Sequence, residues 1–147
     1  MSAELLGRLL AGRLTDPENG QPVSVTTRAV RIEPSLRGGE TELVQALDLG
    51  GRLAIIADPT TWQVLGARIS GALGAAFTVT PIILSAKPHA DIETVQRIRS
   101  CSSVADALLA VGSGTINDLT KYAAHLDGKP YACFGTAPSM NGYVSEN

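Results

Sequence analysis

Four short apolar runs alternate with helix-like segments in this chain of 147 residues, and this alternation constrains the fold more than any other feature. The runs are Arg52–Ala57, Phe77–Leu84, Ala107–Val111 and Tyr131–Phe134. Continuous apolar runs of this length are typical of strands buried on both faces of a parallel sheet. Pro81 indicates that the second run forms an edge strand or contains a bulge. The pattern Thr27–Ile32 predicts a further strand before the first run.

The segments between the runs have helical periodicity, and each has one apolar face. These faces contain Trp62, Leu65, Ile69 and Leu73, then Ile92, Val95 and Ile98 behind a predicted cap at Asp91, and finally Ile116, Leu119, Ala123 and Leu126. Strands and helices that alternate in this way form right-handed crossovers, so we expect an α/β fold with a Rossmann-like, doubly wound parallel sheet. Such sheets bind ligands at the carboxyl ends of their strands, where Asp58, Gly112 and Thr136 fall.

A glycine-containing turn, Gly112-Ser-Gly-Thr-Ile116, joins the third run to the helix after it. Gly112 and Gly114 can adopt backbone angles closed to other residues, and the helix that starts near Thr115 directs its free N–H groups at the turn. These features are typical of a phosphate-binding site. An ordinary strand-to-helix turn has them too, and Asn117 stands where the dinucleotide fingerprint has its third glycine.

Polar side chains near this edge also have two interpretations each. Asp58 precedes a proline, as helix caps do, but its carboxylate is equally suited to accept hydrogen bonds from an adenosine ribose. Asp118 and Lys121 share one helix face, which is either part of the site or simply solvated. The hydroxyls of Thr136 and Ser139 either satisfy loop backbone or bind a nicotinamide or ribose.

The first residues precede the alternation. One face of a short amphipathic helix carries Leu5, Leu6, Leu9 and Leu10, and Arg8 and Arg13 interrupt the apolar centre that a signal peptide would need. A polar link with proline and glycine follows over Thr15–Pro22. We therefore expect an N-terminal helix and link over residues 1–22 and one α/β domain over residues 23–147.

The composition limits the classes of partner. The formal net charge is −2, whereas proteins that bind nucleic acids or anionic membranes usually carry a clustered basic face, so we expect neither partner. No run approaches the roughly 20 apolar residues of a membrane span. Cys101 and Cys133 lie in apolar surroundings, which favours reduced thiols in a cytoplasmic protein. His89 and His125 lack metal-ligand spacing, so we expect no metal site within the chain, and no pattern identifies a catalytic residue.

Two longer segments, Gly112–Tyr122 and Gly128–Ser145, together resemble sn-glycerol-1-phosphate dehydrogenases, especially the bacterial branch. The wider superfamily includes glycerol dehydrogenases, iron-containing alcohol dehydrogenases and 3-dehydroquinate synthase. The resemblance extends from about Thr27 to the end of the sequence, and the second segment is much more specific than the glycine turn.

This resemblance implies a site for NAD or NADP and assigns its residues. The pyrophosphate would lie against Gly112, Ser113, Gly114, Thr115 and Ile116, the adenosine ribose against Asp58, and the nicotinamide side against Thr136, Ala137, Pro138, Ser139 and Ser145. Asn141 would face the substrate, a small phosphorylated polyol, at a position where many relatives have an aspartate. An asparagine keeps an acceptor oxygen but removes a charge.

The resemblance also implies that the whole enzyme has a C-terminal helical domain, whose aspartate and two histidines hold zinc or nickel and are not supplied by this chain. The whole enzyme would be a homodimer or higher homo-oligomer that interconverts dihydroxyacetone phosphate and sn-glycerol 1-phosphate by hydride transfer, in phospholipid metabolism. We expect the chain alone to be inactive. The alternatives are a sibling enzyme, 3-dehydroquinate synthase or glycerol dehydrogenase, and a non-catalytic α/β module that binds a phosphate ligand.

Overall fold

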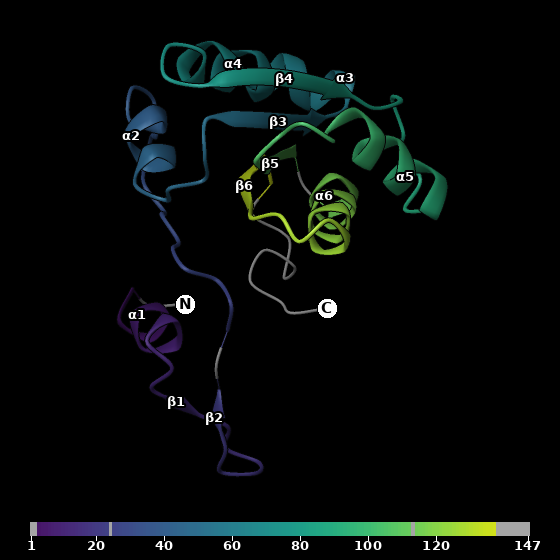
Figure 1. Cartoon of the computed structure of the whole chain (residues 1–147). Helices are drawn as coiled ribbons and strands as arrows, with labels where there is room; N and C mark the ends of the chain where they lie inside the picture. Colours follow the sequence, from purple (N-terminus) through teal and green to yellow (C-terminus); the bar gives the residue numbers. More distant parts are fainter. Residues whose placement is uncertain (1–2, 24, 113, 138–147) are drawn as a thin grey trace. The chain divides into compact units, whose positions relative to one another are not determined.

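The computed structural model describes residues 3–23, 25–112 and 114–137, in two compact units (Figure 1). Within these residues the first unit ends at Ser35 and the second begins at Leu36. The expected N-terminal helix lies in the first unit, and so do the first residues of the expected α/β domain, up to Ser35.

The first unit contains a helix and a small hairpin. Helix α1 (Ala3–Leu10) is followed by β1 (Leu14–Thr15), which pairs antiparallel with β2 (Pro22–Val23). The segment expected to be a polar link is thus mainly the loop of this hairpin. Asp16 and Asn19 accept hydrogen bonds from the backbone N–H groups of Glu18 and Gln21, and Gly20 has a φ of 71°, a left-handed conformation suited to a tight turn.

The strand expected over Thr27–Ile32 is not formed. Within the described residues this segment pairs with no strand, and Ile32 is 81% exposed. Alternating apolar residues make a stable strand only where a neighbour supplies hydrogen bonds and an apolar surface to cover one face. This segment has no such neighbour among the described residues.

The second unit is built on a parallel sheet of four strands in the order β4-β3-β5-β6 (Figure 1). The strands are β3 (Arg52–Ala57), β4 (Thr78–Ile83), β5 (Ala107–Gly112) and β6 (Tyr131–Gly135). They confirm all four predicted runs and the α/β fold class. Pro81 lies on β4, an edge strand, where it is the register partner of Ile55 in β3. The edge position was predicted because proline has no backbone N–H.

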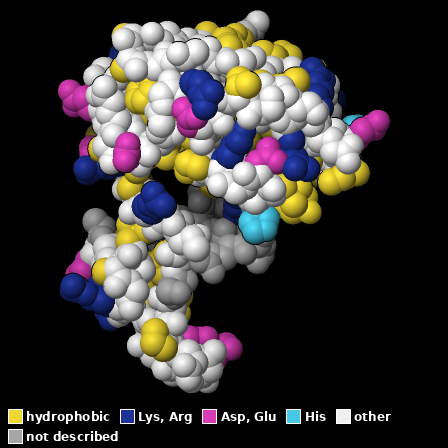
Figure 2. Space-filling view, in the orientation of Figure 1, with side chains coloured by type: hydrophobic (Ala, Val, Ile, Leu, Met, Phe, Trp, Pro, Cys, Tyr) yellow, Lys and Arg dark blue, Asp and Glu magenta, His cyan; other side chains and the backbone are white. Residues whose placement is uncertain are grey.

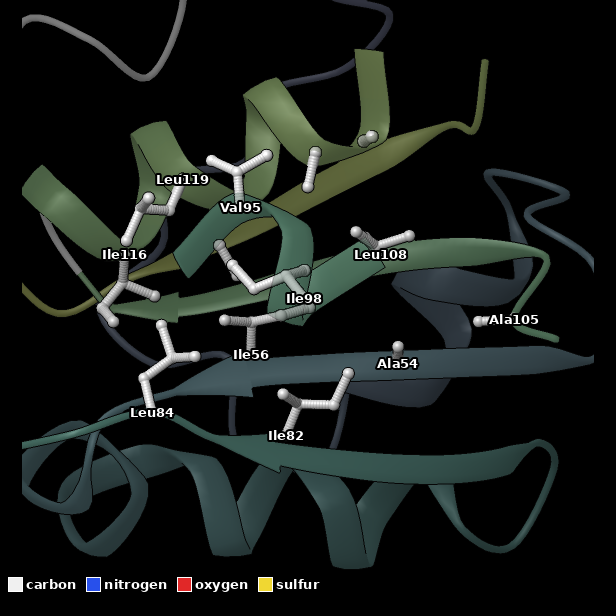
Figure 3. Packing of buried hydrophobic residues seen from close by; sticks show 13 residues of the cluster. Ala54, Ile56, Ile82, Leu84, Val95, Ile98, Ala105, Leu108, Ile116 and Leu119 are labelled. Carbon is white, nitrogen blue, oxygen red and sulfur yellow. The ribbon is translucent and has the colours of Figure 1, made fainter. Parts of the chain in front are cut away.

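Helices cover both faces of this sheet. They are α2 (Glu40–Gln45), the continuous segment α3 (Pro59–Thr61), η1 (Trp62–Gly66) and α4 (Ala67–Leu73), then α5 (Ile92–Cys101) and α6 (Gly114–Leu126). Val44 of α2 and Ile69 and Leu73 of α4 pack with Ile55 in one buried cluster. The other face packs against α5 and α6, as Figure 3 shows for Val95, Ile98, Ile116 and Leu119 around Ile56. The sheet is therefore doubly wound.

Local contacts determine the start of α5 and the winding of the helix after β3. Asp91 accepts a hydrogen bond from the backbone N–H of Thr94 at 2.8 Å, which confirms the predicted cap of α5. The helix after β3 is wound as a π-helix over Trp62–Gly66, where the backbone N–H of Ala67 bonds to the carbonyl of Trp62. A Cβ atom on Gly66 would lie 2.6 Å from the indole ring, so this winding needs a glycine.

Candidate functional site

The strand order creates a switch point between β3 and β5. These strands are neighbours, yet the chain leaves β3 towards β4 along one face of the sheet and leaves β5 towards β6 along the other. At such a reversal the two connections diverge and leave a crevice at the carboxyl ends of the strands, where doubly wound sheets bind ligands. Asp58 follows β3, and Gly112 ends β5.

The glycine turn brings α6 unusually close to the end of β5. A Cβ atom on Gly112, which is buried, would lie 2.7 Å from Cβ of Ile116 and about 3.0 Å from two further atoms of that side chain. Gly114 begins α6 with a φ of 40°, a left-handed conformation that favours glycine. Ser113 lies outside the described residues. The turn thus needs both glycines, and its helix presents a positive dipole end at the switch point.

Ile116 has its side chain in the core, where it is 2% exposed and packs with the cluster in Figure 3. Of this residue only the backbone is available to a ligand. Thr115, in the first turn of α6, is half-buried. Ile116 therefore packs in the core, whereas Thr115 lies at the border of the turn.

The end of β6 lies beside the same turn. The backbone N–H of Thr136 donates to the carbonyl oxygen of Gly112 at 3.1 Å, and Gly135 is the register partner of Gly112. Thr136 and Ala137 are both half-buried. Of the other predicted residues, Pro138, Ser139, Asn141 and Ser145 lie outside the described part of the chain. The structure therefore unites Gly112, Gly114 and Thr136 at one edge.

Asp58 forms the predicted helix cap. Its Oδ1 accepts from the backbone N–H of Thr61 at 2.8 Å, while the hydroxyl of Thr61 accepts from the backbone N–H of Asp58 at 3.1 Å. Within the described residues Oδ2 makes no hydrogen bond, and the residue is half-exposed. The cap uses one carboxylate oxygen and leaves the other at the switch point, so its binding of a ribose stays a prediction.

Asp118 and Lys121 lie close enough to Cys133 of β6 for their charges to affect the pKa of its thiol. The pKa of Cys133 in β6 is raised to about 12, mainly by burial and in part by the charge of Asp118, while Lys121 opposes the shift. Asp118 is exposed and Lys121 half-buried. A thiol with this pKa stays protonated at neutral pH, so Cys133 is not an activated nucleophile. The two charged residues remain candidates at the border of the site.

Two buried polar residues of α6 were not anticipated from the sequence. Asn117 is fully buried and accepts a hydrogen bond from the hydroxyl of Tyr131, with 2.5 Å between Oδ1 and Oη. Thr120 is also fully buried, and its hydroxyl donates to the carbonyl of Ile116 at 2.7 Å. The sequence shows Asn117 only as a departure from the glycine fingerprint, because its partner lies on a different element, strand β6.

The opposite, amino-terminal edge carries a polar depression lined by Gln96, Arg99, Ser100, Ser103, Asp127 and Lys129. Here Arg99 pairs with Asp127 at 2.6 Å, and the ammonium of Lys129 donates to the carbonyls of Ser102 and Ser103. These bonds connect the ends of α5 and α6. We interpret this cluster as structural, since ligands of parallel sheets bind at the other edge.

The part of the chain that the structure describes contains neither a group of potential metal ligands nor a helix that could span a membrane. No three histidine, cysteine or acidic side chains there are grouped closely enough to hold a metal ion. None of the described helices is both long enough and apolar enough to cross a bilayer. Figure 2 shows basic and acidic side chains interspersed on the face in view.

The fold and the candidate site define the chain as a Rossmann-like α/β domain with a glycine turn at its switch point. The chain belongs to the iron-containing alcohol dehydrogenase family, whose family model matches residues 31–147. This match confirms the superfamily that the two sequence segments indicated.

Curated relatives named glycerol-1-phosphate dehydrogenase (NAD(P)+) are similar to this chain. The Bacillus licheniformis protein is 31% identical over 99 residues, covering 64% of this chain and 25% of the relative. The Halalkalibacterium halodurans protein is 35% identical, covering 63% and 25%. For the Pyrococcus furiosus protein the identity is 30%, covering 82% and 34%. The chain thus spans between a quarter and about a third of the length of these relatives.

Solved structures share the fold. The crystal structure of glycerol dehydrogenase from Schizosaccharomyces pombe has a TM-score of 0.56 and 22% identity, covering 63% of this chain and 23% of that one. A probable glycerol dehydrogenase from Sinorhizobium meliloti 1021 has a TM-score of 0.60 and 22% identity, covering 74% and 29%. At this identity the comparison supports the architecture alone.

Proposed function

We propose that this chain is the dinucleotide-binding part of a metal-dependent polyol-phosphate dehydrogenase, which interconverts dihydroxyacetone phosphate and sn-glycerol 1-phosphate by hydride transfer. One observation carries the proposal: the turn at Gly112 and Gly114 lies at the switch point of a doubly wound sheet, with Thr136 beside it. The names of the curated relatives supply the substrate class and the choice of NAD or NADP.

The turn is suited to bind the pyrophosphate of the cofactor. In an α-helix the first backbone N–H groups have no partner within the helix, and they carry its positive dipole end. In α6 these groups belong to Gly114, Thr115 and Ile116, next to Ser113. Because Gly112 has no Cβ, the helix can lie against β5 and bring its donors within reach of a phosphate.

The rest of the dinucleotide extends to the neighbouring strands. Oδ2 of Asp58 would accept hydrogen bonds from the adenosine ribose, and this carboxylate disfavours the additional phosphate of NADP. The nicotinamide side would lie near Thr136 and Ala137, together with Pro138, Ser139 and Ser145, and Asn141 would face the substrate. When bound, the nicotinamide supplies the chemistry of hydride transfer.

The described residues do not fit the metal ion of such an enzyme, since no group of potential ligands is found among them. We therefore assign zinc or nickel to parts of the whole protein beyond this chain and derive no catalytic step from it here. We further propose a cytoplasmic protein that forms a homodimer or higher homo-oligomer, with Cys101 and Cys133 as free thiols.

The test uses two glycines as a matched pair, one at the start of α6 and one beyond its end. Gly114 and Gly128 both have a positive φ, 40° and 62°, but Gly128 lies beyond the other end of the helix in open space. Gly114→Val should weaken NADH binding at least about tenfold in calorimetry, since it removes the phosphate geometry. Gly128→Val introduces similar strain and should leave the affinity for NADH unchanged.

Absence of NADH and NADPH binding by the folded wild-type chain would contradict the proposed dinucleotide site. Equal weakening by both variants would contradict the assignment of the site to the turn. The substrate is tested separately, with the whole protein and added zinc or nickel. Turnover of dihydroxyacetone phosphate would support this assignment, and turnover of glycerol alone would favour the sibling enzyme.

A further inference from the structure

We propose that Asn117, held by Tyr131, is a positioning residue for the dinucleotide site. The inference rests on the proposed function, because it assigns a task to a residue beside the glycine turn rather than a new ligand. It starts from the buried side-chain amide of Asn117, which is neither part of the glycine turn nor an apolar residue of the core.

Asn117 is fully buried in the first turns of α6, between Ile116 and Asp118 in the sequence. A primary amide that leaves water loses hydrogen bonds, and an apolar side chain would fill the same space without that cost. Nearby inward residues of the helix, Ile116 and Leu119, are indeed apolar. The amide is therefore present for the bonds that it makes.

The hydrogen bonds of Asn117 have defined donors and acceptors, and one of them connects strand β6 to helix α6. The hydroxyl of Tyr131 donates to Oδ1 of Asn117 at 2.5 Å, and Nδ2 of Asn117 donates to a carboxylate oxygen of Asp118 at 3.2 Å. Because a carboxylate only accepts, Asp118 fixes which end of the amide faces it, and the oxygen is left for Tyr131. The amide thus connects the start of α6 to strand β6 and orients Asp118.

The first turn of α6 is consequently held from two sides. Ile116 packs against Gly112 at the end of β5, and Asn117 is bonded to Tyr131 of β6. A phosphate bound by backbone N–H groups needs those groups held in place before it arrives, since ordering them on binding lowers affinity. The bond to Tyr131 supplies this pre-organisation on the side of the helix that faces β6.

Tyr131→Phe removes only the hydroxyl and should raise the Kd of the chain for NADH about three- to tenfold, the effect of one buried hydrogen bond. The matched control is Thr120→Val, which removes a fully buried hydroxyl of α6 that is bonded within the helix. This control should lower the midpoint of urea unfolding and leave the Kd for NADH at its wild-type value.

A double variant separates positioning from stability. In Asn117→Leu/Tyr131→Phe both partners are apolar, so the urea midpoint should recover from the values of the single variants. The affinity for NADH should stay weakened, because the amide that orients Asp118 and the first turn is missing. If the affinity recovers together with the midpoint, the pair is only structural and the inference is overturned.

The outcomes distinguish the inference from the function on which it rests. Equal Kd values of wild type and Tyr131→Phe overturn the inference alone, since the dinucleotide site is then intact without it. A folded wild-type chain that does not bind NADH overturns the proposed function and, with it, this role of Asn117.

Discussion

Single residues set the geometry at both edges of the sheet. At the carboxyl edge, Gly112 allows Ile116 to approach β5 more closely than any side chain would permit. At the amino edge, Gly50 has a φ of 87° and a Cβ atom there would lie 2.5 Å from Asp106, so the chain enters β3 directly over this carboxylate. Two glycines that look alike in the sequence thus position a candidate site in one case and an ion pair in the other.

Asp106 leads to a prediction about acid stability. Its carboxylate accepts from the side chain of Arg52 and from the backbone N–H groups of Arg52 and Gly51, and these bonds lower the pKa of Asp106 to about 2. A lowered folded-state pKa means that the stabilisation is fully present above the unfolded value of 3.8 and is lost as the pH falls through about 2.

Urea midpoints measured between pH 5 and about pH 2 should therefore decrease with acid in the wild type and decrease less in Asp106→Asn, which has no carboxylate to protonate. The variant should already be less stable at pH 5. Identical pH profiles of the two proteins would show that this carboxylate does not contribute to the acid dependence.

At the scale of elements, α2 is attached to α4 by polar contacts as well as by its apolar face. Glu40 is 2% exposed and pairs with Arg68 of α4, while its second oxygen accepts from the backbone N–H of Gly38 at 2.8 Å. Thr41 also donates to the carbonyl of Ala72 at 2.9 Å. The short helix α2 is therefore stabilised by tertiary contacts, as expected for a helix of six residues.

Replacing Glu40 with glutamine should destabilise the second unit by about 2 kcal/mol, because Arg68 then keeps its charge without a partner. We set the value below that of a fully buried pair, since the arginine side chain is 35% exposed. Glu42→Gln is the matched control, because Glu42 lies in the same helix and is exposed. Equal urea midpoints of the two variants would contradict the importance of this ion pair.

The elements also show what the sequence could predict. After Arg52, the runs at β3 and β5 are apolar because both faces of these central strands are covered, and this makes them recognisable in the sequence. Helix α2 was missed, since its short acidic sequence has little periodicity and depends on Arg68. The strand expected over Thr27–Ile32 had the right pattern without a neighbour. A sequence pattern reflects the conformational preferences of the residues within one segment. The formation of α2 and of the strand expected over Thr27–Ile32 depends instead on partners elsewhere in the chain.

The same distinction applies to the candidate site within the whole molecule. Gly112, Gly114, Asp58 and Thr136 were predicted because parallel strands place their carboxyl ends at one edge. The bond of Tyr131 to Asn117 was not predictable, because these residues come from different elements and their contact depends on how α6 packs against β6. Local signals in the sequence therefore predict which residues lie at this edge, whereas the buried contacts around them depend on packing that a sequence pattern does not contain.

Amide NMR during a titration of the chain with NADH tests whether the carboxyl edge between β3 and β5 binds a dinucleotide. We predict saturable shifts concentrated at Asp58, at Gly112 to Ile116 and at Thr136, with the amides of Arg99 and Lys129 at the opposite edge unchanged. Shifts centred on Arg99 and Lys129, or no shifts in a folded chain, would contradict the account.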